Sequence, residues 1–489
     1  MNRRTRTALT AASAAALTGG LFTAAAPAAV AADAAVVARA DFNGDGAGDV
    51  VSSARATVNG HPKAGQVVVT YGVKSKGLTA DRRSVISQAT PGVAGTPEEA
   101  DWFGWRNAYA DFDGDGYDDL AVGAHREDVG DVQDAGSVTV LWGSAGGLTG
   151  QGSVQIENPA GDFRSARWGD RLAAGDFDGD GRQDLAVIGL STTVTLIKGG
   201  ITRSGSYGDA QQVPTPLTDR ISQALTAGDV DGDGATDLLV GGFAEEGMES
   251  IRVPRNFLLR GSPSGLDPAG VTEMPPGSHS SIGDIDRDGL ADVVSGMTYD
   301  RWTDRPGLPY SSLGGRIWIT YGTEDGTGRV RSVDQDTAGV PGVGETGDGF
   351  GFSTDLGDID GDGYLDLAVG VVSEVVGATR TGAVVILHGS ASGITTGGAQ
   401  TLHQATSGVP GTAEDGDGFG GDVKLDDVTG DGRADLVVAS PGENDGNGGI
   451  TFLPAGGGRI TATGSRVLSP TALGVPTAGK PMLGEDLAR

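Results

Sequence analysis

The sequence predicts an all-β protein, a seven-bladed β-propeller of four-stranded antiparallel blades. Two observations lead to this prediction. One nine-residue acidic pattern recurs seven times, and its first aspartates lie 70, 65, 53, 55, 74 and 69 residues apart. No helix-like periodicity fills these intervals, which contain short β-branched and apolar runs typical of four strands each. Seven such units cover one another's faces and hide most strand edges when they are arranged radially.

The second unit shows the order of elements most clearly. Phe103-Gly104 opens a segment that runs through Tyr109 into the acidic loop, and an apolar run at 120–124 follows the loop directly. A third strand is predicted at 136–143 and a weaker fourth strand at Val154–Ile156. The sixth unit repeats this order, beginning at Phe350-Gly351. A linear β-solenoid is the alternative arrangement, but solenoid turns are usually much shorter than these units.

We therefore expect one propeller domain over residues 34–489. The predicted blades cover residues 34–100, 101–166, 167–218, 219–275, 276–346, 347–415 and 416–480. Residues 481–489 have the form of an opening strand that stops just before its loop, whereas the first unit has only residues 34–40 before its own loop. We expect the C-terminal segment to dock beside the first blade and close the ring. The sequence leaves open which of the two segments takes the inner position.

Each acidic loop places oxygen donors at alternate positions around a fixed glycine. Side chains at positions 1, 3, 5 and 9, with the backbone carbonyl of position 7, can surround a hard cation such as Ca²⁺, which takes six to eight oxygens. The glycine at position 6 permits the sharp turn that the loop needs. The predicted ligands are Asp41, Asn43, Asp45, Ala47, Asp49, Asp111, Asp113, Asp115, Tyr117, Asp119, Asp176, Asp178, Asp180, Arg182, Asp184, Asp229, Asp231, Asp233, Ala235, Asp237, Asp284, Asp286, Asp288, Leu290, Asp292, Asp358, Asp360, Asp362, Tyr364, Asp366, Asp427, Thr429, Asp431, Arg433 and Asp435.

The predicted cofactor is Ca²⁺, up to seven ions in all. An EF-hand is excluded, because that loop needs a glutamate at position 12, where the first two copies have Ser52 and Val122. Loops 1 and 7 should bind more weakly, because Asn43 and Thr429 replace an aspartate there. The alternative is an acidic turn that binds nothing, but four carboxylates in one turn repel one another. Seven similar, saturated sites indicate structural staples, since a catalytic metal needs an open position and a nearby base.

The composition limits the possible partners and location. The formal net charge is −30, but the loops hold 26 of the 65 acidic residues, which leaves 39 against 35 basic ones. Nucleic acid is not an expected partner, because the chain lacks a basic footprint. Arg3, Arg4, Arg6 and the apolar stretch that follows them predict a signal peptide at residues 1–31. We expect a secreted, extracellular bacterial protein with no transmembrane segment. There is no cysteine, so calcium could replace the cross-linking that disulfides provide elsewhere.

These residues resemble the FG-GAP repeat of integrin α-subunit propellers and their bacterial relatives. The resemblance rests on Phe-Gly at Phe103, Phe350 and Phe419, on Trp168-Gly169 in its place, and on the acidic loop and the Gly-Ala-like strand end that follow. It covers roughly residues 34–489. The family implies that the loop joins the first two strands of a blade and that ligands meet the opposite face of the disc.

The predicted function is an extracellular binding or adhesion scaffold that resembles an integrin α head. Its partner is an unknown extracellular protein or polysaccharide, and we expect a monomer. One alternative is a lectin-like module that binds polysaccharide, for which Trp102 is the best exposed aromatic candidate. The other is a secreted hydrolase of esterase or phospholipase type. The sequence gives little support for catalysis: it has no Gly-x-Ser-x-Gly elbow, and His388 ends an apolar strand as a packing residue does.

Overall fold

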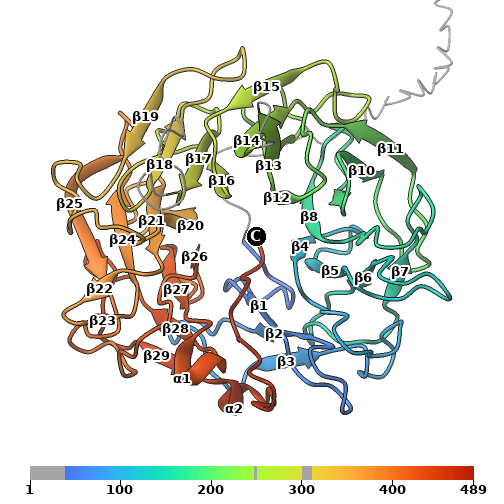
Figure 1. The fold of residues 1–489 in the computed structure, drawn as a ribbon, viewed down its shortest axis with the longest axis horizontal. Coiled ribbons are helices and arrows are strands. Elements are labelled where there is room, and N and C mark those ends of the chain that lie inside the picture. Colours follow the sequence, from blue (N-terminus) through green and yellow to red (C-terminus); the bar gives the residue numbers. More distant parts are fainter. Residues whose placement is uncertain (1–38, 247–250, 300–310) are drawn as a thin grey trace, which may run out of the picture. The chain divides into compact units, whose positions relative to one another are not determined.

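The apolar runs form seven antiparallel sheets whose main strands are hydrogen-bonded in chain order. The computed structural model describes residues 39–246, 251–299 and 311–489, so the predicted signal peptide lies outside the described residues. Figure 1 shows the sheets around a common centre, with the first strand of each sheet innermost. The predicted all-β, seven-bladed propeller is therefore confirmed. Within the described part of the chain, none of the helices has the length and apolar character needed to cross a membrane.

The strands of each blade have the following bounds. Blade 1 contains β1 (Val50–Ala54), β2 (Gln66–Thr70) and β3 (Arg83–Ile86). Blade 2 contains β4 (Asn107–Ala110), β5 (Asp119–Ala124), β6 (Ser137–Leu141) and β7 (Val154–Ile156). Blade 3 contains β8 (Arg171–Gly175), β9 (Asp184–Ile188), β10 (Thr193–Lys198) and β11 (Asp209–Pro214). Blade 4 contains β12 (Ser222–Gly228), β13 (Asp237–Glu246), β14 (Ile251–Leu259) and β15 (Val271–Met274).

The second half of the ring continues this pattern. Blade 5 contains β16 (His279–Gly283), β17 (Asp292–Met297), β18 (Arg316–Thr320) and β19 (Val330–Val333). Blade 6 contains β20 (Phe350–Gly357), β21 (Asp366–Val371), β24 (Ala383–His388) and β25 (Thr395–Leu402), with a small hairpin of β22 (Val375–Val376) and β23 (Thr379–Arg380). Blade 7 contains β26 (Asp422–Asp426), β27 (Asp435–Ala439), β28 (Ile450–Leu453) and β29 (Arg466–Leu468), and two four-residue helices are α1 (Glu443–Gly446) and α2 (Pro470–Leu473).

Burial explains why the middle strands of a blade have the clearest sequence signal. Every residue of β5 and β6 is buried, because both faces of these strands are covered by neighbouring blades. In the outer strand β7 only Ile156 is buried, so its sequence signal is weaker. An apolar cluster fills the junction between each blade and the next, including the junction of blade 7 with blade 1. The hydrophobic core is therefore itself a closed ring.

Both ends of the described chain contribute to the inner strand of blade 1. Near the acidic loop, the N–H of Asp49 donates to the carbonyl of Ala40 at 2.7 Å. Farther along β1, the C-terminal segment takes over: Leu487 pairs antiparallel with Ser52, and the N–H of Ala488 donates to the carbonyl of Val51 at 3.1 Å. The inner position that the sequence left open is thus shared by two segments, and the chain end near the centre of Figure 1 follows from this pairing.

The Phe-Gly pattern has a steric basis at the junctions between blades. Gly420 has φ +88°, and a Cβ there would lie 2.4 Å from the carbonyl oxygen of Ala383 in the preceding blade. Gly370, near the end of β21 in the preceding blade, is equally confined, since a Cβ there would lie 2.2 Å from the carbonyl oxygen of Gly420. Glycine at both positions therefore allows two backbones to touch. Leu483-Gly484 reproduces this arrangement at the end of the chain, where Leu483 pairs with Gly448 just as Phe419 pairs with Gly382.

Candidate metal centres

Loops 2 to 7 each lie between the first and second strands of their blades, and loop 1 lies between the inner segment at Ala40 and β1. Antiparallel strand order therefore places all seven loops at the same end of their blades. The residue at position 2 anchors each loop in the core. These side chains are at most 2% exposed: Phe42, Phe112, Phe177, Val230, Ile285, Ile359 and Val428. The acidic side chains that flank an anchored residue therefore have a fixed starting geometry.

The carboxylate at position 1 organises the turn. In loop 2, Asp111 accepts hydrogen bonds from the N–H groups of Gly114, Asp115 and Gly116 at 2.8, 3.0 and 2.9 Å. The bond from the glycine at position 6 recurs in all seven loops at 2.8–3.0 Å. Because several N–H groups converge on one carboxylate, the loop closes on itself and directs its other side chains inward.

The carboxylate at position 9 ties the loop to the third strand of the blade. Asp119 accepts from the N–H of Phe112 at 3.0 Å and from the N–H of Gly143, just after β6, at 2.8 Å. The bond from the third-strand side recurs in every loop at 2.7–3.0 Å. This residue therefore connects the loop and the first three strands, which is why an ion bound to it would stiffen the whole blade.

Position 3 supplies the observation that tests whether a cation fits. In loops 2 to 5, one carboxylate oxygen at this position is buried and has no hydrogen-bond partner among the described residues: Oδ1 of Asp113, Asp178, Asp231 and Asp286. A buried, unpartnered carboxylate oxygen is costly unless a cation or donor meets it. The same loops bring at least three acidic side chains to within 4.8 Å of one another. The residues present therefore fit a hard divalent cation.

The structure brings together some of the predicted ligands and leaves the position of others a prediction. The group of loop 2 unites positions 1, 3 and 5, and the groups of loops 3, 4 and 5 unite positions 1, 3 and 9. The carbonyl groups at position 7 and the identity of the ion remain predictions.

Burial strongly perturbs the pKa of six of the carboxylates at position 9. It raises the pKa of Asp49 to about 8. It raises the pKa of Asp119, Asp184, Asp237 and Asp292 to about 7 and that of Asp435 to about 6. Hydrogen bonds from backbone N–H groups lower these pKa values again, but burial is the larger effect. Burial therefore makes these six carboxylates easier to protonate than the same groups in water.

Basic side chains from neighbouring hairpins approach three of these loops. Arg203 donates to Asp113 and Asp115 at 2.6 Å in loop 2. Lys198 lies 3.6 Å from Asp178 in loop 3, and Arg260 lies 3.2 Å from Asp231 in loop 4. Each cationic group pairs with Oδ2 of the position-3 aspartate and leaves the buried Oδ1 without a partner. The basic groups therefore offset part of the loop charge without filling the candidate metal position.

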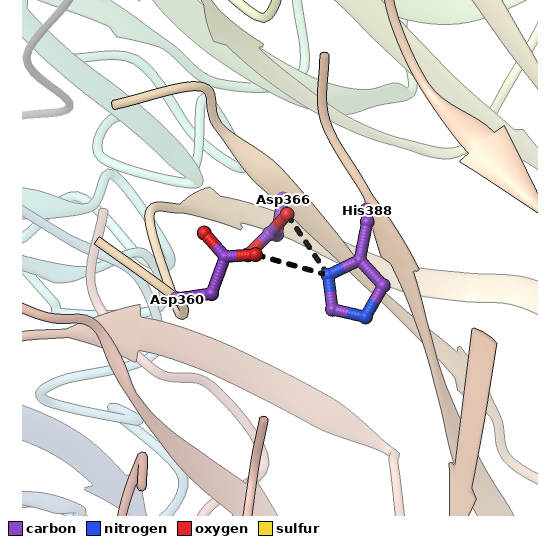
Figure 2. A group of neighbouring side chains, drawn as sticks. All are labelled: Asp360, Asp366 and His388. Carbon is purple, nitrogen blue, oxygen red and sulfur yellow. Dashed lines mark hydrogen bonds and ion pairs between the residues drawn. The ribbon is translucent and has the colours of Figure 1, made fainter. Parts of the chain in front are cut away.

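Loop 6 has an imidazole beside its carboxylates (Figure 2). Nδ1 of His388, at the end of β24, lies 3.3 Å from Oδ1 of Asp366 and 4.0 Å from Oδ2 of Asp360. The hydrogen bond with Asp366 raises the pKa of His388. The sequence predicted His388 as a packing residue and missed its contact with the loop. The sequence feature that could have revealed this contact is the position of His388 directly before Gly389, whose N–H donates to Asp366.

The end of the blades opposite the loops contains Trp102. This side chain is half-buried, because the ring of Trp105 lies 4.7 Å from it and the guanidinium of Arg55 lies 4.4 Å above it. One face of the predicted sugar-stacking residue is therefore already covered by the protein. A more exposed aromatic ring is that of Phe163, which is 44% exposed and was not singled out from the sequence.

Family models match four segments of the chain. The model described as FG-GAP repeat matches residues 103–141, 350–387 and 419–453, and the model described as FG-GAP-like repeat matches residues 176–240. The chain carries FG-GAP repeats. The matched FG-GAP segments begin at Phe103, Phe350 and Phe419, the Phe-Gly positions that pack between blades.

Curated relatives include integrin α subunits and a phospholipase. Integrin alpha-PS2 of Drosophila melanogaster is 28% identical over 222 residues, 41% of this chain and 15% of the relative. Phosphatidylinositol-glycan-specific phospholipase D of Rattus norvegicus is 30% identical over 246 residues, 50% of this chain and 27% of the relative. Integrin alpha-IIb of Homo sapiens is 29% identical over 234 residues, 45% of this chain and 21% of the relative. The match thus spans less than a third of each of these relatives, and this FG-GAP propeller is integrin-α-like in that part.

Solved structures with similar arrangements have low sequence identity. The exotype rhamnogalacturonan lyase YesX has a TM-score of 0.40 and 17% identity, over 84% of this chain and 70% of that chain. AofleA from Arthrobotrys oligospora has a TM-score of 0.38 and 10% identity, over 78% of this chain and 88% of that chain.

Proposed function

We propose that this FG-GAP propeller is a secreted, calcium-stapled scaffold that binds an extracellular protein or polysaccharide through the face opposite its acidic loops. The observation that carries the proposal is the repeated loop geometry. Loops 2 to 5 each keep a buried, unpartnered carboxylate oxygen at position 3, next to further carboxylates fixed by backbone N–H groups. Several hard oxygen donors gathered around one position suit Ca²⁺.

The proposed role of the ions is mechanical. Position 9 already connects each loop to the third strand through a hydrogen bond, so an ion held there would clamp three strands at one end of the blade. A bound ion would also replace the protons that burial favours on these carboxylates. Seven clamps around a closed apolar core would give a rigid disc. Rigidity favours binding, because a preorganised surface loses little conformational entropy when a ligand arrives.

The proposed recognition face follows from the topology. In an antiparallel blade, the connection between the second and third strands and the connection to the next blade lie at the end opposite the acidic loop. These connections vary in length from one blade to the next and are free of the loop pattern. Variable connections on a rigid frame are where proteins usually place their binding residues. We propose a monomer as the active form.

A binding panel tests the proposed function. The purified, calcium-loaded protein is passed over insoluble polysaccharides and immobilised extracellular matrix proteins, and the same panel is repeated after calcium is removed with EDTA. Retention on one class of ligand in calcium, with weaker retention in EDTA, supports a calcium-stapled binding scaffold. Retention on polysaccharide selects the lectin-like role, and retention on protein selects adhesion. No retention on any ligand in calcium contradicts a binding role.

A further inference from the structure

The recognition face contains a basic pocket between blades 2, 3 and 4. Its volume is about 610 Å³, within the range of small-molecule sites. Three stretches of chain form it: the connection from blade 2 to blade 3, the β9–β10 connection, and the connection from blade 3 to blade 4. All three lie at the end opposite the acidic loops, so the pocket is separate from the candidate metal centres.

Three arginines converge on this pocket in a strongly acidic chain. Arg164, Arg167 and Arg220 line it, and none of them forms an ion pair with a carboxylate among the described residues. Arg164 donates to the amide oxygen of Gln133 at 2.5 Å, and Nε of Arg167 is buried with no partner in the described structure. Elsewhere in the ring, arginines such as Arg203 are neutralised by aspartates. Unneutralised guanidinium groups around one pocket indicate an anionic ligand, because their fork of N–H donors matches a carboxylate.

One carboxylate, that of Asp219, also lines the described part of the pocket. The side chain of Asp219 is buried, and its Oδ1 accepts the N–H of Ile221 at 3.2 Å. It therefore lowers the positive charge of the pocket without cancelling it.

Two apolar side chains give the pocket a second kind of wall. Phe163 is 44% exposed and Ile221 is 37% exposed, which places both among the few large apolar side chains that the protein leaves in solvent. An exposed aromatic ring can stack against the C–H face of a sugar ring. The occupant should therefore offer a carboxylate and a flat, weakly apolar face in the same small unit.

The pocket wall is held in place before any ligand arrives. The N–H of Ser165 donates to the carbonyl of Gln133 at 2.9 Å, and the N–H of Arg167 donates to the carbonyl of Asp134 at 3.1 Å. Both residues have left-handed backbone angles, φ +58° for Ser165 and +50° for Arg167, which are unfavourable for side chains other than glycine. The same left-handed pair precedes the opening strand of other blades, as at Ala100 and Trp102, so this conformation belongs to the repeat and fixes the position of the pocket wall.

We infer that this pocket binds an acidic oligosaccharide composed of uronic acid units, with carboxylates on the arginines and a sugar ring against Phe163. This inference rests on the proposed function and names the ligand class of the proposed recognition face. A uronic acid chain repeats one carboxylate per ring, so one ligand can meet several arginines. A simple inorganic anion would satisfy the arginines but leave Phe163 and Ile221 unused.

Isothermal titration of the calcium-loaded protein with a galacturonic acid trimer tests the inference. The matched ligands are a neutral galactose trimer and a glutamate peptide of equal charge. We expect binding of the acidic trimer that weakens as NaCl is raised, and at least tenfold weaker binding of the other two ligands. No binding of the acidic trimer, or equal binding of the glutamate peptide, overturns the inference.

Variants locate the binding to this pocket. Arg167→Gln and Arg220→Gln should each weaken binding of the acidic trimer about tenfold or more, because each removes a charge-assisted contact. Phe163→Ala should weaken it without changing its salt dependence. The control Arg459→Gln changes an exposed arginine on a blade 7 hairpin and should leave affinity unchanged. Equal affinity of Arg220→Gln and the control overturns the inference, whereas retention on the wider panel would leave the proposed binding function intact.

Discussion

Replacing Leu483 with alanine should substantially destabilise the propeller, because this residue closes the ring. Leu483 is fully buried in the apolar cluster shared by blades 7 and 1, together with Ile450 and Phe452. Its N–H donates to the carbonyl of Asn447 at 3.0 Å, and it pairs with Gly448 at the position that Phe419 takes one blade earlier. Leu483 therefore packs at the junction where the last blade meets the first.

The expected cost can be worked from these contacts. A buried Leu→Ala change costs about 2–5 kcal/mol of unfolding free energy. Removing residues 482–489 would delete a second buried leucine, Leu487, together with five backbone hydrogen bonds to the rest of the chain. At about 1.5–3 kcal/mol per leucine and about 1 kcal/mol per hydrogen bond, the truncation costs roughly 8–11 kcal/mol. This is comparable with the whole stability of a typical protein, about 5–15 kcal/mol.

Urea unfolding in saturating calcium measures this effect. Leu483→Ala should lower the transition midpoint strongly, and the truncated chain should fail to give a cooperative transition. The matched control is Val343→Ala, because this side chain is 66% exposed and its loss should change stability by less than about 0.5 kcal/mol. A Leu483→Ala midpoint equal to that of the control would refute the ring-closure reasoning.

Three further predictions concern the loops and the blade junctions. In EDTA the thermal midpoint should fall as pH rises from about 4 to 8. Burial raises the pKa of Asp237 to about 7 and of Asp49 to about 8. The folded state therefore binds protons that the unfolded chain has already released, and the stability from this proton binding is lost as the pH rises through these values. Saturating calcium should abolish this trend, and an identical trend with and without calcium would contradict it. Asp286→Ala should remove one bound calcium per chain and lower the midpoint in calcium more than in EDTA, whereas Glu324→Ala, an exposed acidic control, should do neither. An unchanged calcium count in the Asp286 variant would contradict the site. Gly420→Ala should destabilise the fold by more than about 1 kcal/mol, because φ is +88° there and a Cβ would meet the backbone of the preceding blade. Urea unfolding measures this change, and a midpoint equal to that of the wild type would refute the steric argument.

The strand order and the place of the acidic loops in each blade could be predicted from the sequence because each depends on local chemistry. The second unit shows this well: a weak fourth strand expected at Val154–Ile156 is β7. The acidic loops share a spacing that forces position 1 and position 6 together through one hydrogen bond. The repetition then predicts the ring, since seven similar units arranged radially cover one another's faces and hide most strand edges.

Features that join distant segments could not be predicted in the same way. The inner strand of blade 1 is shared by Ala40 and the segment around Leu487, and no local pattern says how two short segments divide one position. The contact of His388 with Asp366 joins the ends of two paired strands, β24 and β21, that are 22 residues apart in the sequence. The basic pocket unites Arg164 and Arg220 from different blades, and only the ring geometry brings their side chains to one place.

The most direct test of the central claim is a calcium count combined with a thermal melt. The protein is dialysed against calcium, its bound calcium per chain is measured by elemental analysis, and its melting temperature is compared with that of the same sample after EDTA treatment and confirmed metal loss. The calcium-staple account predicts several bound ions, up to seven, and a markedly lower melting temperature once they are removed. No bound calcium, or an unchanged melting temperature after confirmed calcium loss, would contradict it.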